Sequence, residues 1–188
     1  MIYVRDDDVL LGEFLKFKRV HDTICRSPRL MHRPAIVVLD IQKFDDAMLL
    51  VEKETKEGRM LPEVHGLEHI DYAKVPFVEI KNHLYTCIEF IKNKFDYTPL
   101  KWYTPWGADT EEMRTASKEV GLELVNCEDR NKLRGEDSVW DYMSQGNDMS
   151  YLEGKEIFMH YWDKLDRKRL SLFLDYINKK SPHDSGLS

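Results

Sequence analysis

Apolar positions along the chain follow two alternating patterns: short apolar runs, and longer stretches in which apolar residues recur at helical spacing. The short runs predict strands at residues 2–5, 35–39, 100–103, 122–125 and 156–160. The longer stretches predict helices at residues 10–25, 44–55, 79–95, 109–120 and 165–179. Asp109 is expected to cap its helix, with Glu112 as the capping-box partner. Residues 181–188 are predicted to form a disordered tail.

The alternation of strands and helices predicts an α/β fold with a mainly parallel sheet, either open and doubly wound or closed into a barrel. In both architectures, site residues gather at the carboxyl ends of the strands. Three charged features lie at such ends: the aspartates at 6–8, the segment around His65, and His160. Residues 129–154 have weak periodicity and are interpreted as a long loop that lines the site.

Composition excludes several classes of function. The chain has 188 residues, of which 42% are hydrophobic and 33% charged, as in one soluble globular domain. A net charge of -6 without a basic stripe argues against nucleic acid as the main partner. No segment reaches the ~18 apolar residues of a membrane span, and no secretory signal is visible, so a cytoplasmic location is the default expectation. Cys25, Cys87 and Cys127 form no CxxC pair and are each interpreted as small buried hydrophobes.

Two features of the sequence indicate a metal ion. His65 and His69 are four positions apart, so a helical turn would bring both imidazoles to one face, although two surface histidines explain the spacing equally well. The adjacent carboxylates at 6–8 repel one another unless a cation or solvent relieves them, although one of them could instead cap a helix. One aspartate with two histidines leaves open coordination positions, which a catalytic metal requires.

Taken in order, these segments resemble the motifs of the polysaccharide deacetylase family, the NodB-homology carbohydrate esterases. The matching runs are Arg5-Asp6-Asp7-Asp8-Val9, His65-Gly66-Leu67-Glu68-His69, Trp102-Tyr103-Thr104-Pro105-Trp106-Gly107 and Phe158-Met159-His160. The order and spacing of the motifs agree from Ile2 to about His160, and the ordered set is more specific than any one motif. The resemblance implies a single catalytic domain at 1–180, folded as a distorted, abbreviated (β/α)7-type barrel.

The resemblance also implies roles for individual residues. Asp8, His65 and His69 would bind one divalent metal ion, for which Zn²⁺ is the first choice. Asp7 would be the catalytic base, and His160 the general acid, although a histidine on an apolar strand is by itself more often a core residue. The implied reaction is the metal-dependent hydrolysis of an N-acetyl group on an amino sugar or glycan.

The third motif and its surroundings supply the remaining candidates. The backbone N–H of Tyr103 would stabilise the oxyanion. Pro105 and Trp106 would contact the sugar, and Trp140 is the best candidate for a further tryptophan-bearing motif. Aromatic faces stack on sugar rings, but most aromatic residues belong to a core.

Two positions depart from the family pattern. Gly66 stands where a serine or threonine is usual, and Tyr103 stands where an arginine normally pairs with the base aspartate. Arg5 or Arg114 could replace that arginine. These departures, with the short chain, keep two alternatives open: a metal-dependent hydrolase of a small non-sugar amide or cyclic imide, and a catalytically silent relative that binds a glycan or a partner protein.

Overall fold

The structure is a computed structural model that describes residues 1–9, 13–125 and 152–179. The predictions for Trp140, for the tail at 181–188 and for most of the loop at 129–154 lie outside these residues. None of the helices described is long and apolar enough to cross a membrane.

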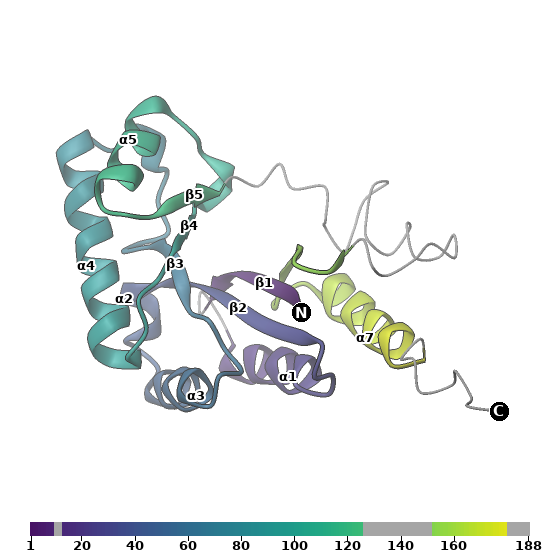
Figure 1. The fold of residues 1–188 in the computed structure, drawn as a ribbon. Helices are drawn as coiled ribbons and strands as arrows, with labels where there is room; N and C mark the ends of the chain where they lie inside the picture. Colours follow the sequence, from purple (N-terminus) through teal and green to yellow (C-terminus); the bar gives the residue numbers. More distant parts are fainter. Residues whose placement is uncertain (10–12, 126–151, 180–188) are drawn as a thin grey trace.

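Six parallel strands form one sheet in the order β5-β4-β3-β2-β1-β6. The strands are β1 Ile2–Val9, β2 Leu30–Val37, β3 Glu63–Gly66, β4 Lys101–Tyr103, β5 Glu123–Val125 and β6 Glu156–His160. The last of the strands described, β6, lies beside the first, β1, which is how a barrel of parallel strands begins to close. The sheet is a curled half-barrel flanked by helices (Figure 1), so the predicted abbreviated α/β barrel is confirmed.

Helices follow the strands and bury one face each. They are α1 Phe14–Ile24, α2 Val38–Ile41, α3 Asp45–Lys56, α4 Phe77–Phe95, α5 Glu111–Glu119 and α7 Lys164–Lys179, with short 3₁₀ turns at Tyr72–Lys74 and Pro105–Gly107. The predicted stripe of α4 is buried at Ile80, Leu84, Cys87, Ile91 and Phe95, and the helix packs against β3, α3 and α5. The spacing of apolar residues therefore determines which face of α4 covers the sheet.

Several predicted boundaries were wrong. β1 continues to Val9, so the aspartates at 6–8 lie inside the strand and do not cap α1, which begins after Glu13. β2 begins at Leu30, and the predicted strand residues 38–39 belong to α2. Neither boundary follows from hydrophobicity, because buried charged residues continue both strands. The aspartates of β1 are therefore part of the sheet itself.

The predicted cap of α5 was also wrong. Thr110 caps this helix, with its side-chain oxygen accepting a hydrogen bond from the backbone N–H of Met113 at 3.2 Å. Asp109 instead accepts hydrogen bonds from Arg114 at 2.6 and 2.8 Å. Aspartate and threonine are both good N-cap residues. Thr110 is the cap here because the Asp109 side chain is paired with Arg114.

Candidate metal centre and active site

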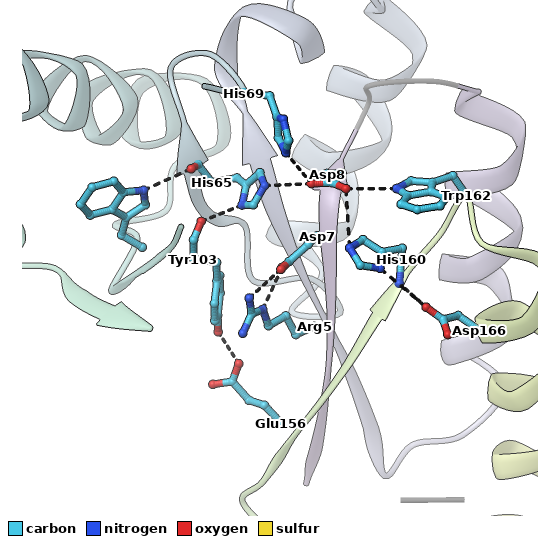
Figure 2. Close-up of polar contacts among 11 residues, drawn as sticks. Arg5, Asp7, Asp8, His65, His69, Tyr103, Glu156, His160, Trp162 and Asp166 are labelled. Atoms are coloured by element: carbon cyan, nitrogen blue, oxygen red, sulfur yellow. Dashed lines mark hydrogen bonds and ion pairs between the residues drawn. The ribbon is translucent and has the colours of Figure 1, made fainter. Parts of the chain in front are cut away.

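The backbone at the end of β1 separates its three aspartates. Successive side chains of a strand point to opposite faces. Asp8 leaves the extended conformation with a φ of 58°, in a region that aspartate tolerates better than most residues. The pairing of β1 with β2 also shifts register between Asp6 and Val9. As a result Asp7 and Asp8 lie together between His65 of β3 and His160 of β6 (Figure 2).

Asp6 is directed into a different environment. It is fully buried, and its Oδ1 accepts a hydrogen bond from the backbone N–H of Tyr161 at 2.7 Å. Burial raises the pKa of Asp6 well above its ordinary value, although the hydrogen bond from Tyr161 opposes this shift. The charge repulsion that the three adjacent aspartates imply is therefore reduced at Asp6.

Asp8 contacts both predicted metal-binding histidines. Its Oδ1 lies 2.9 Å from His65 Nε2 and 2.9 Å from His69 Nε2. One ligand atom from each of the three residues lies within 4.8 Å of the others. Burial raises the pKa of Asp8, but the hydrogen bonds from His65 and His69 outweigh burial and hold this pKa well below its ordinary value. The structure thus brings together the three residues that the sequence analysis grouped as ligands.

The hydrogen bonds of His65 indicate what the space between these groups requires. His65 Nδ1 lies 2.6 Å from the carbonyl oxygen of Tyr103, and a carbonyl only accepts, so Nδ1 carries a proton. With Nδ1 occupied in this way, the contact between Nε2 and the carboxylate of Asp8 needs either a second proton on the ring or a cation between the two atoms. Two imidazole nitrogens and one carboxylate oxygen form a donor set typical of zinc-type ions.

Asp7 forms a buried ion pair with an arginine of its own strand. Arg5 Nε and Nη2 donate to Asp7 Oδ1 and Oδ2 at 2.8 and 2.6 Å, and the two side chains are only 1% and 2% exposed. The guanidinium lies 4.0 Å from the centroid of the Tyr103 ring and 4.8 Å from that of Phe158. Of the two arginines suggested by the sequence, Arg5 therefore pairs with the predicted base, whereas Arg114 forms an exposed pair elsewhere.

The surroundings of Tyr103 explain why a tyrosine fits at this position. It is fully buried, and its hydroxyl donates to Glu156. Glu156 also pairs with Arg33 at 2.7 Å and with Lys101. Burial, followed by the charge of Glu156, raises the pKa of the Tyr103 hydroxyl far above its ordinary value, so this hydroxyl stays a donor. The oxyanion role predicted for the backbone N–H of Tyr103 remains a prediction.

His160 lies at the end of β6, opposite Asp7 in the strand register. Its Nε2 is 3.6 Å from Asp8 Oδ2. Its buried Nδ1 has no hydrogen-bond partner among the residues described, but it is 3.8 Å from Asp166 Oδ2, which accepts the backbone N–H of His160 at 2.9 Å. Asp166 thus holds the position of His160 and places a carboxylate oxygen near its Nδ1. The sequence analysis missed Asp166. The one feature of the sequence that could have indicated it is a carboxylate six positions after His160.

Two exposed tryptophans lie close to the ligand set. Trp106, 66% exposed, packs edge-on against His69 with ring centroids 4.6 Å apart. Trp162, 44% exposed, donates from Nε1 to Asp8 Oδ2 at 3.2 Å, a contact that the sequence analysis missed. Pro105 is buried in the turn that carries Trp106. The aromatic faces available to a ligand here therefore come from Trp106 and Trp162.

Steric contacts explain why glycine occupies position 66. A Cβ at this position would lie 2.8 Å from the carbonyl oxygen of Glu68 and 2.9 Å from both Cε2 and the hydroxyl oxygen of Tyr72. The Tyr72 hydroxyl accepts the backbone N–H of Leu67 at 3.0 Å. Tyr72 therefore fills the space beside Gly66 and places a hydroxyl oxygen next to the turn.

Replacing Gly66 by serine is expected to destabilise the protein by about 1–3 kcal/mol, because the added atoms overpack against Tyr72 and the backbone. Urea denaturation measures this change. In a cycle with Tyr72→Leu, which removes the ring and its hydroxyl, the two losses should be less than additive. A Gly66→Ser protein as stable as the wild type would contradict this explanation.

Comparisons with known proteins show which solved structures share this architecture. No family model matches the sequence, and no curated protein matches it. Among solved structures, a family 4 carbohydrate esterase from Streptomyces lividans has a TM-score of 0.69 at 13% identity, covering 95% of this chain and 88% of that one. A peptidoglycan deacetylase from Bacillus subtilis has a TM-score of 0.70 at 14% identity, covering 96% of this chain and 83% of that one.

A third similar structure is a pseudoenzyme. It is a carbohydrate esterase family 4 pseudoenzyme from Bacillus anthracis, with a TM-score of 0.71 at 8% identity, covering 96% of this chain and 61% of that one. A mutant of that pseudoenzyme with restored enzymatic activity also matches. The chain therefore has the fold of the polysaccharide deacetylases, a fold that carries both active and inactive proteins.

Proposed function

We propose that this protein is a metal-dependent hydrolase that removes the acetyl group from an N-acetylated sugar or glycan. The observation that carries the proposal is the convergence of Asp8, His65 and His69 beside the buried Arg5–Asp7 pair. A silent relative would have no need to keep a buried carboxylate paired with an arginine next to a metal-ligand set. The similar structures, which include a peptidoglycan deacetylase, favour an acetylated carbohydrate.

A divalent ion held by Asp8, His65 and His69 would polarise the substrate carbonyl and lower the pKa of water. Asp7 then acts as the general base, taking the proton of the water that attacks the amide carbon. Arg5 fixes both oxygens of Asp7 with two hydrogen bonds, which orients the carboxylate. Asp7 therefore needs no further support from position 103.

An amide nitrogen leaves only after it gains a proton, so the reaction also requires an acid. His160 Nε2 lies on the same side as Asp8, within 3.6 Å of its carboxylate, and gives its proton to the departing amine. Asp166, on the Nδ1 side of the ring, stabilises the protonated imidazole that performs this step. Asp7 and His160 thus divide base and acid work between two strands.

Acetate release from oligomers of N-acetylglucosamine tests the proposal. Protein treated with a chelator should be inactive and should recover with Zn²⁺. Asp7→Asn should reduce kcat by about 10²–10⁴-fold while the protein keeps its metal content. Small amides and cyclic imides are the matched alternative substrates, and turnover of those alone would overturn the choice of a glycan. Equal rates for wild type and Asp7→Asn on every substrate would mean that the chain is silent.

Trp106→Ala is expected to raise KM for the sugar oligomers by about tenfold, because one stacking surface is lost. The value of kcat should change much less, since Trp106 touches no group assigned a proton-transfer role. Steady-state kinetics on short and long oligomers measure the effect, with Leu172→Ala, an exposed residue of α7, as the control. An unchanged KM would remove Trp106 from the substrate site.

A further inference from the structure

A second group of metal-binding side chains lies between α1 and α3. His21 Nε2 is 3.0 Å from Glu54 Oε2 and 3.3 Å from Cys25 Sγ. A ligand atom from each residue lies within 4.8 Å of the other two. His21 and Cys25 are four residues apart on α1, so one helix face presents both. Glu54 comes from α3, which runs next to α1 in Figure 1.

A single proton on His21 Nε2 cannot serve both Glu54 and Cys25. The hydrogen bond from Arg59 outweighs burial, which raises the pKa of Glu54, and holds this pKa at about 2, so Glu54 is a carboxylate at neutral pH. His21 Nε2 carries either a proton or a lone pair. With the proton, it bonds Glu54 and offers the Cys25 thiol no lone pair; without it, it accepts from the thiol but faces a carboxylate at 3.0 Å. A cation at the meeting point interacts favourably with all three.

His32 fixes the ring of His21 in the orientation that a metal requires. His32 is fully buried, and its Nδ1 lies 3.1 Å from His21 Nδ1, with the two rings stacked at 5.3 Å. Metal-bound histidines usually bond through their second nitrogen in this way, which fixes ring orientation and tautomer. Burial also lowers the pKa of His21, against the opposing effect of Glu54, so the ring favours the neutral form that binds metals.

We propose that His21, Cys25 and Glu54 form a second zinc site, separate from the active site, that joins α1 to α3. Tetrahedral zinc with one sulfur, one nitrogen and one oxygen ligand separates the donor atoms by about 3.3–3.6 Å. The observed separations of 3.0 and 3.3 Å need to open by only a few tenths of an ångström. Cys25 is exposed, which gives the ion a path from solvent and leaves room for a water as fourth ligand.

Arg59 sets the affinity of this site. Its Nε donates to Glu54 Oε2 at 2.6 Å, and its side chain is 45% exposed. The guanidinium competes with the ion for the same oxygen, and its exposure lets it move into solvent when the ion binds. The thiol of Cys25 loses its proton to the buffer when sulfur binds the ion.

Cobalt(II) titration of the Asp8→Asn protein tests the proposal, because the sulfur ligand gives a distinctive signal. Cobalt bound to a thiolate has a charge-transfer absorption in the near ultraviolet, and Asp8, His65 and His69 contain no sulfur. We expect this absorption in Asp8→Asn, its displacement by Zn²⁺, and its loss in Asp8→Asn with Cys25→Ser. Cys127→Ser is the matched control and should keep it.

Arg59→Gln provides a test of opposite sign. Removing the competing cation should strengthen cobalt binding by about two- to fivefold, whereas Cys25→Ser should abolish it. Cys25 is exposed, so its replacement by serine leaves the core intact, and a circular dichroism melt of the metal-free protein verifies this. The proposal is overturned if the wild-type chain gives no thiolate absorption, if Cys25→Ser retains it, or if Arg59→Gln weakens binding.

Discussion

Replacing Arg5 by methionine is expected to lower the free energy of unfolding by about 3–5 kcal/mol. Asp7 is 2% exposed and accepts two hydrogen bonds from this guanidinium, and removing one partner of a buried ion pair leaves the other charge without compensation. Urea denaturation at neutral pH measures the loss. Activity on N-acetylated oligomers should fall as well, because Asp7 loses its orientation.

The double variant Arg5→Met with Asp7→Asn separates the ion pair from the rest of the packing. With both charges removed, the protein should be more stable than Arg5→Met alone, so the two changes should be strongly non-additive. Arg5→Lys keeps the charge but loses the two-pronged geometry, and it should fall between wild type and Arg5→Met. Additive losses across the cycle would show that Arg5 acts through packing with Tyr103 and Phe158 instead.

The close contact between Arg5 and Tyr103 suggests a rescue. The Arg5 guanidinium lies 4.0 Å from the centre of the Tyr103 ring, so an arginine introduced at 103 would enter the same space. Arg5→Met combined with Tyr103→Arg should recover part of the lost kcat, because the guanidinium again faces Asp7. Recovery of stability should be smaller, since Glu156 loses the donor that Tyr103 provides.

Asp8→Asn is expected to remove bound metal from the active site and to lower kcat/KM by about 10³-fold or more, since metal catalysis contributes several kcal/mol. Asparagine has the shape of aspartate and tolerates the φ of 58° at this position. The loss therefore reports the ligand charge and not the backbone. Metal analysis after dialysis and acetate release measure the two effects.

Asp8→Ala serves as the comparison, because alanine in the left-handed region adds about 1–2 kcal/mol of strain. Both variants should lose the metal equally, but Asp8→Ala should be the less stable in urea. His69→Gln should lose the same metal while leaving the β1 backbone unchanged. Retention of metal and activity by Asp8→Asn would contradict the assignment of Asp8 as a ligand.

The spacing of apolar residues predicted helices and strands well where one face of the element is apolar. It predicted them poorly where charged or polar residues are buried within a strand. The stripe of α4 was clear because its buried residues recur every three or four positions. β1 and β2 were drawn too short or displaced because buried polar residues, such as Asp7 and His32, break the apolar run. Their burial depends on partners from other elements, which no local window contains.

The sequence analysis grouped the three residues that the structure brings together, but it described their surroundings incompletely. The order of motifs identified Asp8, His65 and His69, and it identified Arg5 as one of two possible partners for Asp7. The contact of Trp162 with Asp8, and Asp166 itself, were missed because both arise from the turn between β6 and α7.

The second cluster was missed for a similar reason. Its residues come from two helices, and neither helix has a recognisable metal motif by itself. Cys25 was judged a small buried hydrophobe, which is wrong because its side chain is exposed, whereas Cys87 is buried as expected. Cys127 lies outside the residues described.

The guanidinium that β1 supplies to Asp7 affects how inactive members of this fold can be recognised. A search that scores each motif position separately would count Tyr103 as the loss of the motif arginine. It would then group the chain with the pseudoenzymes. In the bidentate pair, an arginine from two residues earlier in the chain contacts the Asp7 carboxylate, as an arginine at position 103 is expected to do in the family motif. Whether such a sequence has lost its function is better judged by whether any cationic side chain contacts the carboxylate in the folded protein. The residue at a single position of the aligned motif is a poorer guide.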